Sequence, residues 1–455
     1  MKFRFGLIMA ASLWAGLPMT VAAQQAKEFT LGNGMKIVVK EDRRAPTVAH
    51  MIWYRVGSMD EVSGSTGVAH VLEHMMFKGT KKLKPGEFSA RVAALGGREN
   101  AFTSKDYTGY FQQIEKSKLE EVMALEADRL ANLVLSKDEF EKEIRVVMEE
   151  RRLRTEDQPI QLLYEALNAT AYFAHPYRHP IIGWMGDLQA MTVGDTRDWH
   201  QRWYAPNNAT MVVSGDVAAE QVFKLAQKHF GKMPAKALPE TRPQPEPAQR
   251  GIRRVTVKAP AENPYVALAF KVPKLEDVAN DTEPYALEVL AAILDGYDNA
   301  RLNARLVRTD RVAISAGAGY SGISRGPVLF VMDGTPSVGL TTEQLEGLLR
   351  AEVRRIAEEG VTEPELRRVK TQLIASQIYK RDSIFGQAME IGRIEMAGLS
   401  HKQIDHIIAK LGEVTAEQVR SVAGKYFGDD QLTVATLVPL PLTQKAEAPA
   451  TGLRH

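Results

Sequence analysis

The sequence predicts an α+β protein made of two similar halves. Strand-like and helix-like stretches alternate along its 455 residues, and 44% of the residues are hydrophobic, enough for two or three domains that each bury a core. Five prolines interrupt this alternation in residues 234–251, which makes this segment the best linker candidate. Residues 193–216 and 414–439 also resemble each other, since each predicts a helix, an aromatic residue, an Asn- or Asp-rich turn and an apolar strand. Such units recur by chance, so this repeat supports a duplication without deciding it.

The first 23 residues are predicted to be an export signal. Lys2 and Arg4 precede an apolar run at 6–17, and small residues occupy 21–23, where a signal peptidase can cut. No later apolar run approaches the ~20 residues that span a bilayer. We therefore expect a periplasmic or secreted protein that begins at Gln24.

Composition narrows the classes of partner and site. Removal of the predicted signal leaves 56 basic residues against 56 acidic ones, which argues against nucleic acid or an anionic membrane as the main partner. The chain has no cysteine, so disulfides and thiolate metal ligands are excluded. Any metal ion must be bound by histidine and carboxylate.

The predicted elements of the first half follow in order along the chain. β-branched and aromatic residues bounded by glycines indicate strands, whereas spaced apolar residues indicate helices. Ser136 and Glu139 form a predicted capping box at the start of the last helix. The expected strands are 34–42, 47–58 and 100–114, and the expected helices are 66–78, 87–95, 117–132 and 137–155.

The helix at 66–78 carries two histidines and a glutamate among apolar residues, in the stretch GVAHVLEHMMFKGT. At 3.6 residues per turn, His70, Glu73 and His74 project from one face. Such a cluster is costly to bury without charge partners, but two imidazoles so spaced can bind one zinc ion, with a third protein ligand from elsewhere. Glu73 can then act as general base on the attacking water. The order His-x-x-Glu-His is the inverted zincin signature.

We expect the third ligand on the helix that follows Ser136. Glu143 and Glu150 fall on one stripe of this helix, while Glu149 points about 100° away. We predict Glu150 as the ligand, and Glu143 as a carboxylate that orients a ligand histidine through its other ring nitrogen.

Plainer interpretations of these residues remain open. Two histidines at this spacing are usually surface or satisfied core residues, and charged helices are usually solvated faces. The glutamate between the histidines, the apolar neighbours and the distant glutamate pair favour a metal site. His175 and His179, in HPYRHPIIG, could also bind metal, but their proline-rich, irregular setting favours a role in loop packing.

With these residues assembled, the chain resembles the M16 metallopeptidases, the pitrilysin and insulinase group, in the short-chain branch that includes the mitochondrial processing peptidase. The resemblance implies that His70, His74 and Glu150 bind one Zn²⁺ ion per chain and that Glu73 activates water. It also implies two homologous domains, each a largely antiparallel sheet with packed helices. The matching stretches are GSMDEVSGSTGVAHVLEHMMFKGT, GGRENAFTSKDYTGYF, VVMEERRLRTEDQP, HPYRHPIIG and YAPNNATMVVSGD.

The resemblance also implies how a peptide substrate is bound. In the family, the strand that matches NAFTSKDYTGYF is an exposed edge that pairs with an extended peptide, so backbone hydrogen bonds supply affinity. Asn100 and Ala101 match the positions that touch the peptide there. An ordinary sheet strand would fit the same pattern of residues.

The C-terminal half departs from the family pattern. Active single-chain members usually carry an arginine and, seven residues later, a tyrosine that hold the substrate. Here Arg308 is present, but Ser315 stands where the tyrosine is expected, and Tyr320 would face the other side of a strand. We therefore predict a heterodimer with a sister chain that supplies the Arg/Tyr pair, with a homodimer or monomer as the alternative.

The predicted function is that of a zinc-dependent endopeptidase acting on short or unfolded peptides. The alternatives are a non-catalytic assembly subunit of the same fold and a protein that binds peptides or zinc without turnover. The predicted organisation is a signal at 1–23, a catalytic domain at 24–233, a linker at 234–251, a C-terminal domain at 252–440 and a flexible tail at 441–455.

Overall fold

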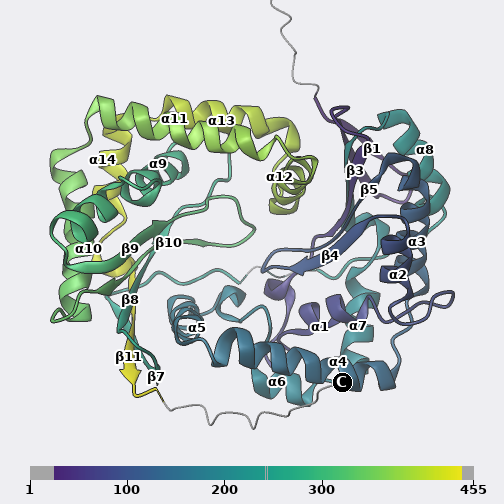
Figure 1. The fold of residues 1–455 in the computed structure, drawn as a ribbon, viewed down its shortest axis with the longest axis horizontal. Coiled ribbons are helices and arrows are strands. Elements are labelled where there is room, and N and C mark those ends of the chain that lie inside the picture. The colour runs from purple at the N-terminus through teal and green to yellow at the C-terminus, as the bar shows by residue number, and fades with distance from the viewer. Residues whose placement is uncertain (1–24, 241, 243, 443–455) are drawn as a thin grey trace, which may run out of the picture.

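A computed structural model describes residues 25–240, 242 and 244–442 of the chain (Figure 1). The predicted signal lies outside this part, as does most of the predicted tail. Within the described residues, no helix combines the length and apolar character needed to cross a membrane.

The described chain forms two sheets with the same topology. The order is β1-β2-β6-β3-β5-β4 in the first sheet and β7-β11-β8-β10-β9 in the second. From β2 and from β7 onward, each sheet follows the order first, fifth, second, fourth, third along the chain. The β2–β6 and β7–β11 pairs are parallel and the other pairs are antiparallel. This shared topology confirms the predicted α+β fold of two homologous, mostly antiparallel domains.

The bounds of the strands are β1 Lys27–Thr30, β2 Lys36–Glu41, β3 Thr47–Tyr54, β4 Arg98–Thr103, β5 Thr108–Glu115, β6 Ala209–Gly215, β7 Arg253–Pro260, β8 Tyr265–Val272, β9 Ala313–Gly319, β10 Val328–Pro336 and β11 Leu432–Leu440. The bounds of the helices are α1 Val68–Met75, α2 Glu87–Ala94, α3 Leu119–Asn132, α4 Lys137–Arg151, α5 Pro159–Ala171, α6 Met185–Ala190, α7 Val193–Trp203, α8 Ala219–Phe230, α9 Glu283–Asp295, α10 Thr342–Glu359, α11 Glu363–Lys380, α12 Ile384–Ala397, α13 Ile404–Glu413 and α14 Ala416–Lys425.

The repeated sequence pattern corresponds to repeated structure. Residues 193–216 form α7 and β6, and residues 414–439 form α14 and most of β11, with a short 3-10 turn between helix and strand in both. In the first sheet this last strand lies between β2 and β3, and in the second it lies in the equivalent place between β7 and β8. The repeat therefore reflects the duplicated fold.

Both faces of each sheet are covered, and one helix on each sheet comes from the other half. Alternate residues of β2 enter different cores, with Ile37 and Val39 on one face and Val38 on the other. Helices of the first half cover the Ile37 face, whereas α12 packs on the opposite face against β3 and β6. In the second sheet, α9, α10 and α14 contribute to one core, and α5 of the first half packs on the other face. Figure 1 shows α5 and α12 between the two sheets.

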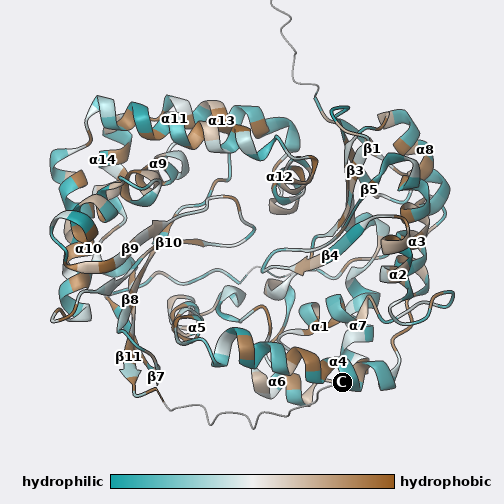
Figure 2. Ribbon diagram, in the orientation of Figure 1, coloured by the Kyte–Doolittle hydropathy of each residue, from teal (hydrophilic) through white to brown (hydrophobic). Residues whose placement is uncertain are grey.

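Most of the helices are amphipathic, which suits their packing on the sheets. Figure 2 shows hydrophobic and hydrophilic residues interspersed along most helices. Ser136 caps α4 by accepting a hydrogen bond from the Glu139 N–H at 3.2 Å, as predicted. The Glu139 carboxylate instead accepts from Lys142 Nζ at 2.7 Å.

The strand expected at 100–114 was wrong in one respect, because this stretch is a hairpin of β4 and β5. The Ser104 hydroxyl accepts from the N–H groups of Asp106 and Tyr107, and the Ser104 N–H donates to the Tyr107 carbonyl at 2.8 Å. Serine closes such turns by bonding the backbone two residues on, a signal that the strand propensity of the flanking residues masks. The hairpin leaves β4 at the edge of its sheet.

The segment between α8 and β7 contains no helix or strand among its described residues. It is nevertheless anchored to both halves through Glu246. The Glu246 carboxylate accepts from the backbone N–H groups of Phe173, Ala174 and His175 and from Lys271 Nζ at 2.8 Å. The domain boundaries drawn from the sequence stay a prediction.

Candidate metal centre

Helix α1 begins in a tightly packed environment that fixes its orientation. Its N-cap, Gly67, has a φ of +88°, and a Cβ there would lie 2.6 Å from the Ile182 carbonyl oxygen, so only glycine fits. The buried Glu61 carboxylate accepts from the N–H groups of Gly67 and Ala69 at 2.8 and 2.9 Å. These bonds satisfy backbone donors that a helix start leaves free.

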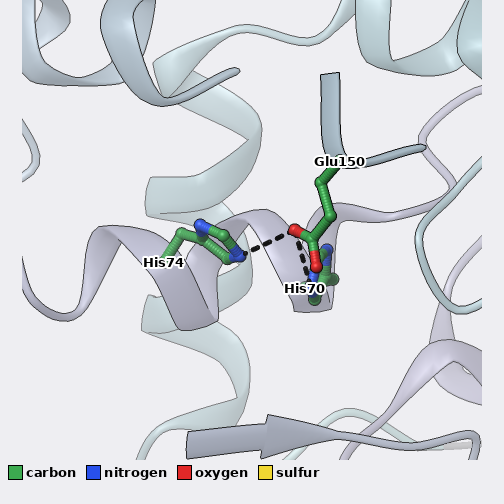
Figure 3. Close-up of side chains that lie close together, drawn as sticks. All are labelled: His70, His74 and Glu150. Atoms are coloured by element: carbon green, nitrogen blue, oxygen red, sulfur yellow. Dashed lines mark ion pairs between the residues drawn. The ribbon is translucent and has the colours of Figure 1, made fainter. Parts of the chain in front are cut away.

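The metal-binding candidates of α1 and α4 meet at one point (Figure 3). Ligand atoms of His70, His74 and Glu150 all lie within 4.8 Å of one another. Glu150 Oε2 is 3.8 Å from His70 Nε2 and 3.4 Å from His74 Nε2, and the two imidazole rings are 4.7 Å apart. Figure 3 shows the Glu150 side chain pointing toward His70 and His74, with its carboxylate close to both rings. The structure thus brings together the three residues predicted as ligands.

The predicted orienting carboxylate contacts the second histidine. Glu143 Oε1 is 2.9 Å from His74 Nδ1, and Lys78 Nζ is 2.5 Å from Glu143 Oε2. The other oxygen of Glu150 pairs with Arg154 at 2.7 Å. A metal-binding imidazole typically donates a hydrogen bond from the N–H of its second nitrogen to a carboxylate in this way.

The surroundings of the two histidines shift their proton affinity in opposite directions. Burial and the neighbouring His74 lower the pKa of His70 to about 4. Burial also opposes the charge of His74, but hydrogen bonds to Glu143 and Glu150 raise its pKa to about 9. The hydrogen bond from His74 lowers the pKa of Glu150. His70 therefore presents a neutral nitrogen beside an ionised carboxylate.

Glu73 faces the same space from α1. Its carboxylate accepts a hydrogen bond from the Thr103 hydroxyl, at the end of β4, and burial raises its pKa. Sequence reasoning did not single out Thr103. The hydroxyl lies at the end of the strand expected to bind peptide, so its proximity to the base depends on how β4 crosses α1.

A cavity of about 1150 Å³ surrounds this group of residues. Asn100 and Ala101, on the edge strand β4, line it together with Glu73 and Glu149. Glu149 pairs with Arg152 at 2.8 Å. The predicted peptide-contacting residues therefore share one cavity with the predicted ligands and base, and their contact with substrate stays a prediction.

The structure places Arg308 elsewhere. It lies on a π-helical turn at Asn303–Thr309, where its guanidinium donates to the Asp298 carbonyl at 2.7 Å, and it is absent from the described lining of this cavity. Ser315 is exposed on β9, and the Tyr320 hydroxyl donates to the Pro273 carbonyl at 2.7 Å. A substrate-binding role for Arg308 stays a prediction.

The two further candidate histidines lie in the loop around Pro176–Arg178. His175 Nδ1 accepts from the Tyr177 N–H at 3.2 Å, and its ring packs edge-on against the Tyr177 ring. His179 Nε2 is 3.3 Å from the Ser63 hydroxyl and lines the cavity. Neither belongs to either of the two groups of described residues that could hold a metal ion, one of which is His70, His74 and Glu150.

Two family models match this chain. Residues 36–184 match the family model for insulinase, peptidase family M16, and residues 190–373 match the model for the peptidase M16 inactive domain. The chain belongs to the M16 peptidase family. It is 33% identical to the zinc protease PqqE of Helicobacter pylori over 95% of this chain and 97% of that protein. It is also 25% identical to a probable mitochondrial-processing peptidase subunit beta of Schizosaccharomyces pombe, over 92% of each.

Solved structures show the same fold for this M16 chain. The crystal structure of a Helicobacter pylori protease has a TM-score of 0.86 at 32% identity, covering 91% of this chain and all of that one. The periplasmic protease PqqL of Escherichia coli has a TM-score of 0.77 at 20% identity, and the match covers 91% of this chain but 48% of PqqL.

The residues of this M16 chain fit a zinc ion. Two imidazole nitrogens and one carboxylate form a donor set that zinc uses in catalytic sites, where a fourth position stays open for water or substrate. The contact of Glu143 with the second nitrogen of His74 adds the outer support that such sites need.

Proposed function

We propose that this chain is a zinc-dependent endopeptidase that hydrolyses short or unfolded peptides. The observation that carries the proposal is the convergence of His70, His74 and Glu150 within 4.8 Å, in one cavity with Glu73. In this proposal, His70, His74 and Glu150 hold one Zn²⁺ ion per chain, and Glu143 keeps the His74 ring in position.

Each group then has a chemical task. Zinc, when bound, lowers the pKa of water toward ~7 and polarises the scissile carbonyl. Glu73 takes a proton from the attacking water and later passes it to the leaving amine. Its raised pKa suits this exchange, and the hydrogen bond from Thr103 fixes its orientation. Asn100 and Ala101 offer backbone groups on an edge strand to an extended peptide.

The test compares three proteins for zinc content and for cleavage of fluorogenic peptides. Wild type should contain zinc and lose activity to a chelator. Glu73→Gln should keep zinc and lose about 10²- to 10⁴-fold in kcat, the typical contribution of a general base. His74→Ala should lose both. A zinc-loaded wild-type protein without turnover, both alone and with a second M16 chain, would instead support the peptide-binding alternative. A Glu73→Gln protein with wild-type kcat would remove Glu73 from its role.

We also propose that a second M16 chain completes the enzyme. Three observations support a second chain. Arg308 does not line the cavity, a serine occupies position 315, and the chain is similar to a protein named as a peptidase subunit. The sister chain would supply the Arg/Tyr pair, with a homodimer as the alternative. Light scattering with activity measurements tests it: full activity of the purified chain as a monomer would contradict a required partner.

The proposed location is the periplasm or the extracellular space. The signal-like residues 1–23 support it, and PqqL, which shares the fold, is described as periplasmic. Cell fractionation with N-terminal sequencing should find the protein outside the cytoplasm, beginning at Gln24.

A further inference from the structure

Lys105 places a positive charge beside the candidate metal centre, at the point where the two halves meet. It lies in the turn that follows β4 and lines the same cavity as Glu73. Its Nζ donates to Asn168 Oδ1 at 3.1 Å, and Asn168 belongs to α5, the helix that packs on the second sheet. The ammonium also lies 5.0 Å from the centre of the Tyr177 ring and 5.6 Å from that of Tyr172. The two tyrosine rings and the Asn168 amide hold the Lys105 ammonium in place, but none of them carries a negative charge that would neutralise it.

No carboxylate of the described residues lies within ion-pair distance of Lys105, and the neighbouring Asp106 is bound to other groups. Asp106 accepts from the Tyr177 hydroxyl and from the Arg325 N–H, and Asp60 pairs with the Arg325 guanidinium at 2.7 Å. Burial lowers the pKa of Lys105 to about 8, against the attraction of Asp106. A half-buried ammonium without a counter-ion favours an anionic ligand.

Three carboxylates that line the cavity are each paired with an arginine. Glu150 pairs with Arg154, Glu149 with Arg152, and Glu165 with Arg151 at 2.8 Å. Lys105 differs from these groups because its described partners are neutral. It follows Thr103, whose hydroxyl reaches Glu73, by two residues. A peptide beside β4 therefore passes the ammonium within about one or two residues of the bond next to Glu73.

We propose that Lys105 is a specificity residue that binds a carboxylate of the peptide substrate, either an acidic side chain or the terminal carboxylate, near the scissile bond. This inference rests on the proposed peptidase function for its substrate class. The ammonium still has donors free after its bond to Asn168, so it can bind a carboxylate without breaking that contact.

The test measures binding separately from cleavage. Labelled peptides are titrated into zinc-loaded Glu73→Gln protein by fluorescence anisotropy, and kcat/KM is measured with wild type. One peptide series replaces glutamate by glutamine at each position, and another replaces the terminal acid by an amide. With Lys105 present, the affinity and the kcat/KM for the acidic peptide should exceed those for the neutral peptide by about 10- to 100-fold. This is the range expected for a hydrogen bond to a charged group. Sensitivity to glutamine identifies a side chain as the ligand, and sensitivity to amidation identifies the terminus.

Variants then assign this preference to Lys105. Lys105→Met should bring the acid-to-neutral ratio close to one, and Lys105→Arg should retain most of it. Lys118→Met, at a partly exposed lysine outside the cavity, is the control and should leave the ratio unchanged. A merely structural lysine would affect both peptides equally, so an unaltered ratio in Lys105→Met overturns the proposal.

Two further outcomes are decisive. If Lys105→Met fails to fold, equal binding of acidic and neutral peptides by the Glu73→Gln protein overturns the proposal without that variant. If wild type cleaves no peptide, either alone or with a second M16 chain, but the Glu73→Gln protein retains a Lys105-dependent preference, the peptidase function fails and the carboxylate site stands.

Discussion

At the residue scale, the most informative contact is the one between Glu143 and His74. The carboxylate holds His74 Nδ1 at 2.9 Å, so the Nε2 atom faces Glu150. The pairing of Glu143 with Lys78 keeps this carboxylate charged, and its pKa is lowered despite burial. Glu143 therefore fixes both the direction and the tautomer of a proposed ligand without contacting the ion itself.

The first prediction follows from this contact. Glu143→Gln should weaken zinc affinity by about 10- to 100-fold, as removal of an outer carboxylate typically does. Competition with a chromophoric zinc chelator measures the affinity. Glu141→Gln, on the same helix but paired with Lys137 at 3.5 Å and exposed, is the control and should bind zinc like wild type. Equal affinity in both variants would show that His74 needs no such support.

Glu246 offers a second prediction, on pH. Partial burial raises the pKa of its carboxyl, but the Lys271 ammonium and three backbone N–H groups lower it to about 2. A carboxyl whose pKa is lower in the folded than in the unfolded state stabilises the fold above its unfolded pKa, and the stabilisation is lost as pH falls toward the folded value. Glu246→Gln should therefore cost about 1–3 kcal/mol at pH 7.

The difference between Glu246→Gln and wild type should shrink as pH falls from 4.5, the ordinary value for glutamate, toward about 2. Urea unfolding at pH 7 and pH 3 measures the two free energies of unfolding. A constant difference across this range would mean that the glutamine acts through packing alone.

At the element scale, α12 approaches the first sheet so closely that one position must be glycine. A Cβ on Gly392 would lie 2.1 Å from the indole of Trp53. Gly392 is in the helix interior, where glycine costs about 1 kcal/mol relative to alanine. Close packing against a buried tryptophan thus offsets a poor helix residue.

This arrangement predicts opposite effects for one substitution at two sites. Gly392→Ala should lower the free energy of unfolding by about 1–3 kcal/mol, because overpacking exceeds the gain in helix propensity. Gly347→Ala, within α10 where a Cβ meets nothing within 4 Å, should raise it by about 0.5–1 kcal/mol. Thermal and urea unfolding of both variants provide the comparison. Stabilisation by both would show that α12 can move away from Trp53.

Local patterns in the sequence predicted the features that depend only on residues close together along the chain, such as helix faces and a helix cap. The spacing of His70, Glu73 and His74 required only helical geometry, and the α4 stripe with its Ser136 cap followed from the same periodicity. Contacts between distant segments had no such signal. The Thr103 hydrogen bond to Glu73, the Lys105 position and the turn within 100–114 all depend on how the hairpin folds back over α1.

At the scale of the whole molecule, the exchange of α5 and α12 ties the halves together. Each helix belongs to one half in sequence and covers the sheet of the other, so neither sheet completes its packing from its own half. The sequence predicted two similar units but not this exchange, because the apolar face of a helix does not indicate which sheet it will pack against. The predicted linker at 234–251 separates the two halves in sequence, but α5 and α12 each pack on the sheet of the other half.

The last prediction concerns the folding of separated halves. A protein ending at residue 233 lacks α12 and exposes apolar residues on the outer face of its sheet, including Met51, Trp53 and Val212. Exposed apolar patches of this kind favour aggregation, so this half alone should be poorly soluble or bind a hydrophobic dye. Co-expression of residues 24–233 with 252–440 should restore soluble protein, since α5 and α12 can then cross between the chains.

The intact chain should unfold in one calorimetric transition, because loss of either half uncovers the other. Two independent transitions, with a soluble first half on its own, would show that the exchanged helices contribute little to the stability of either sheet.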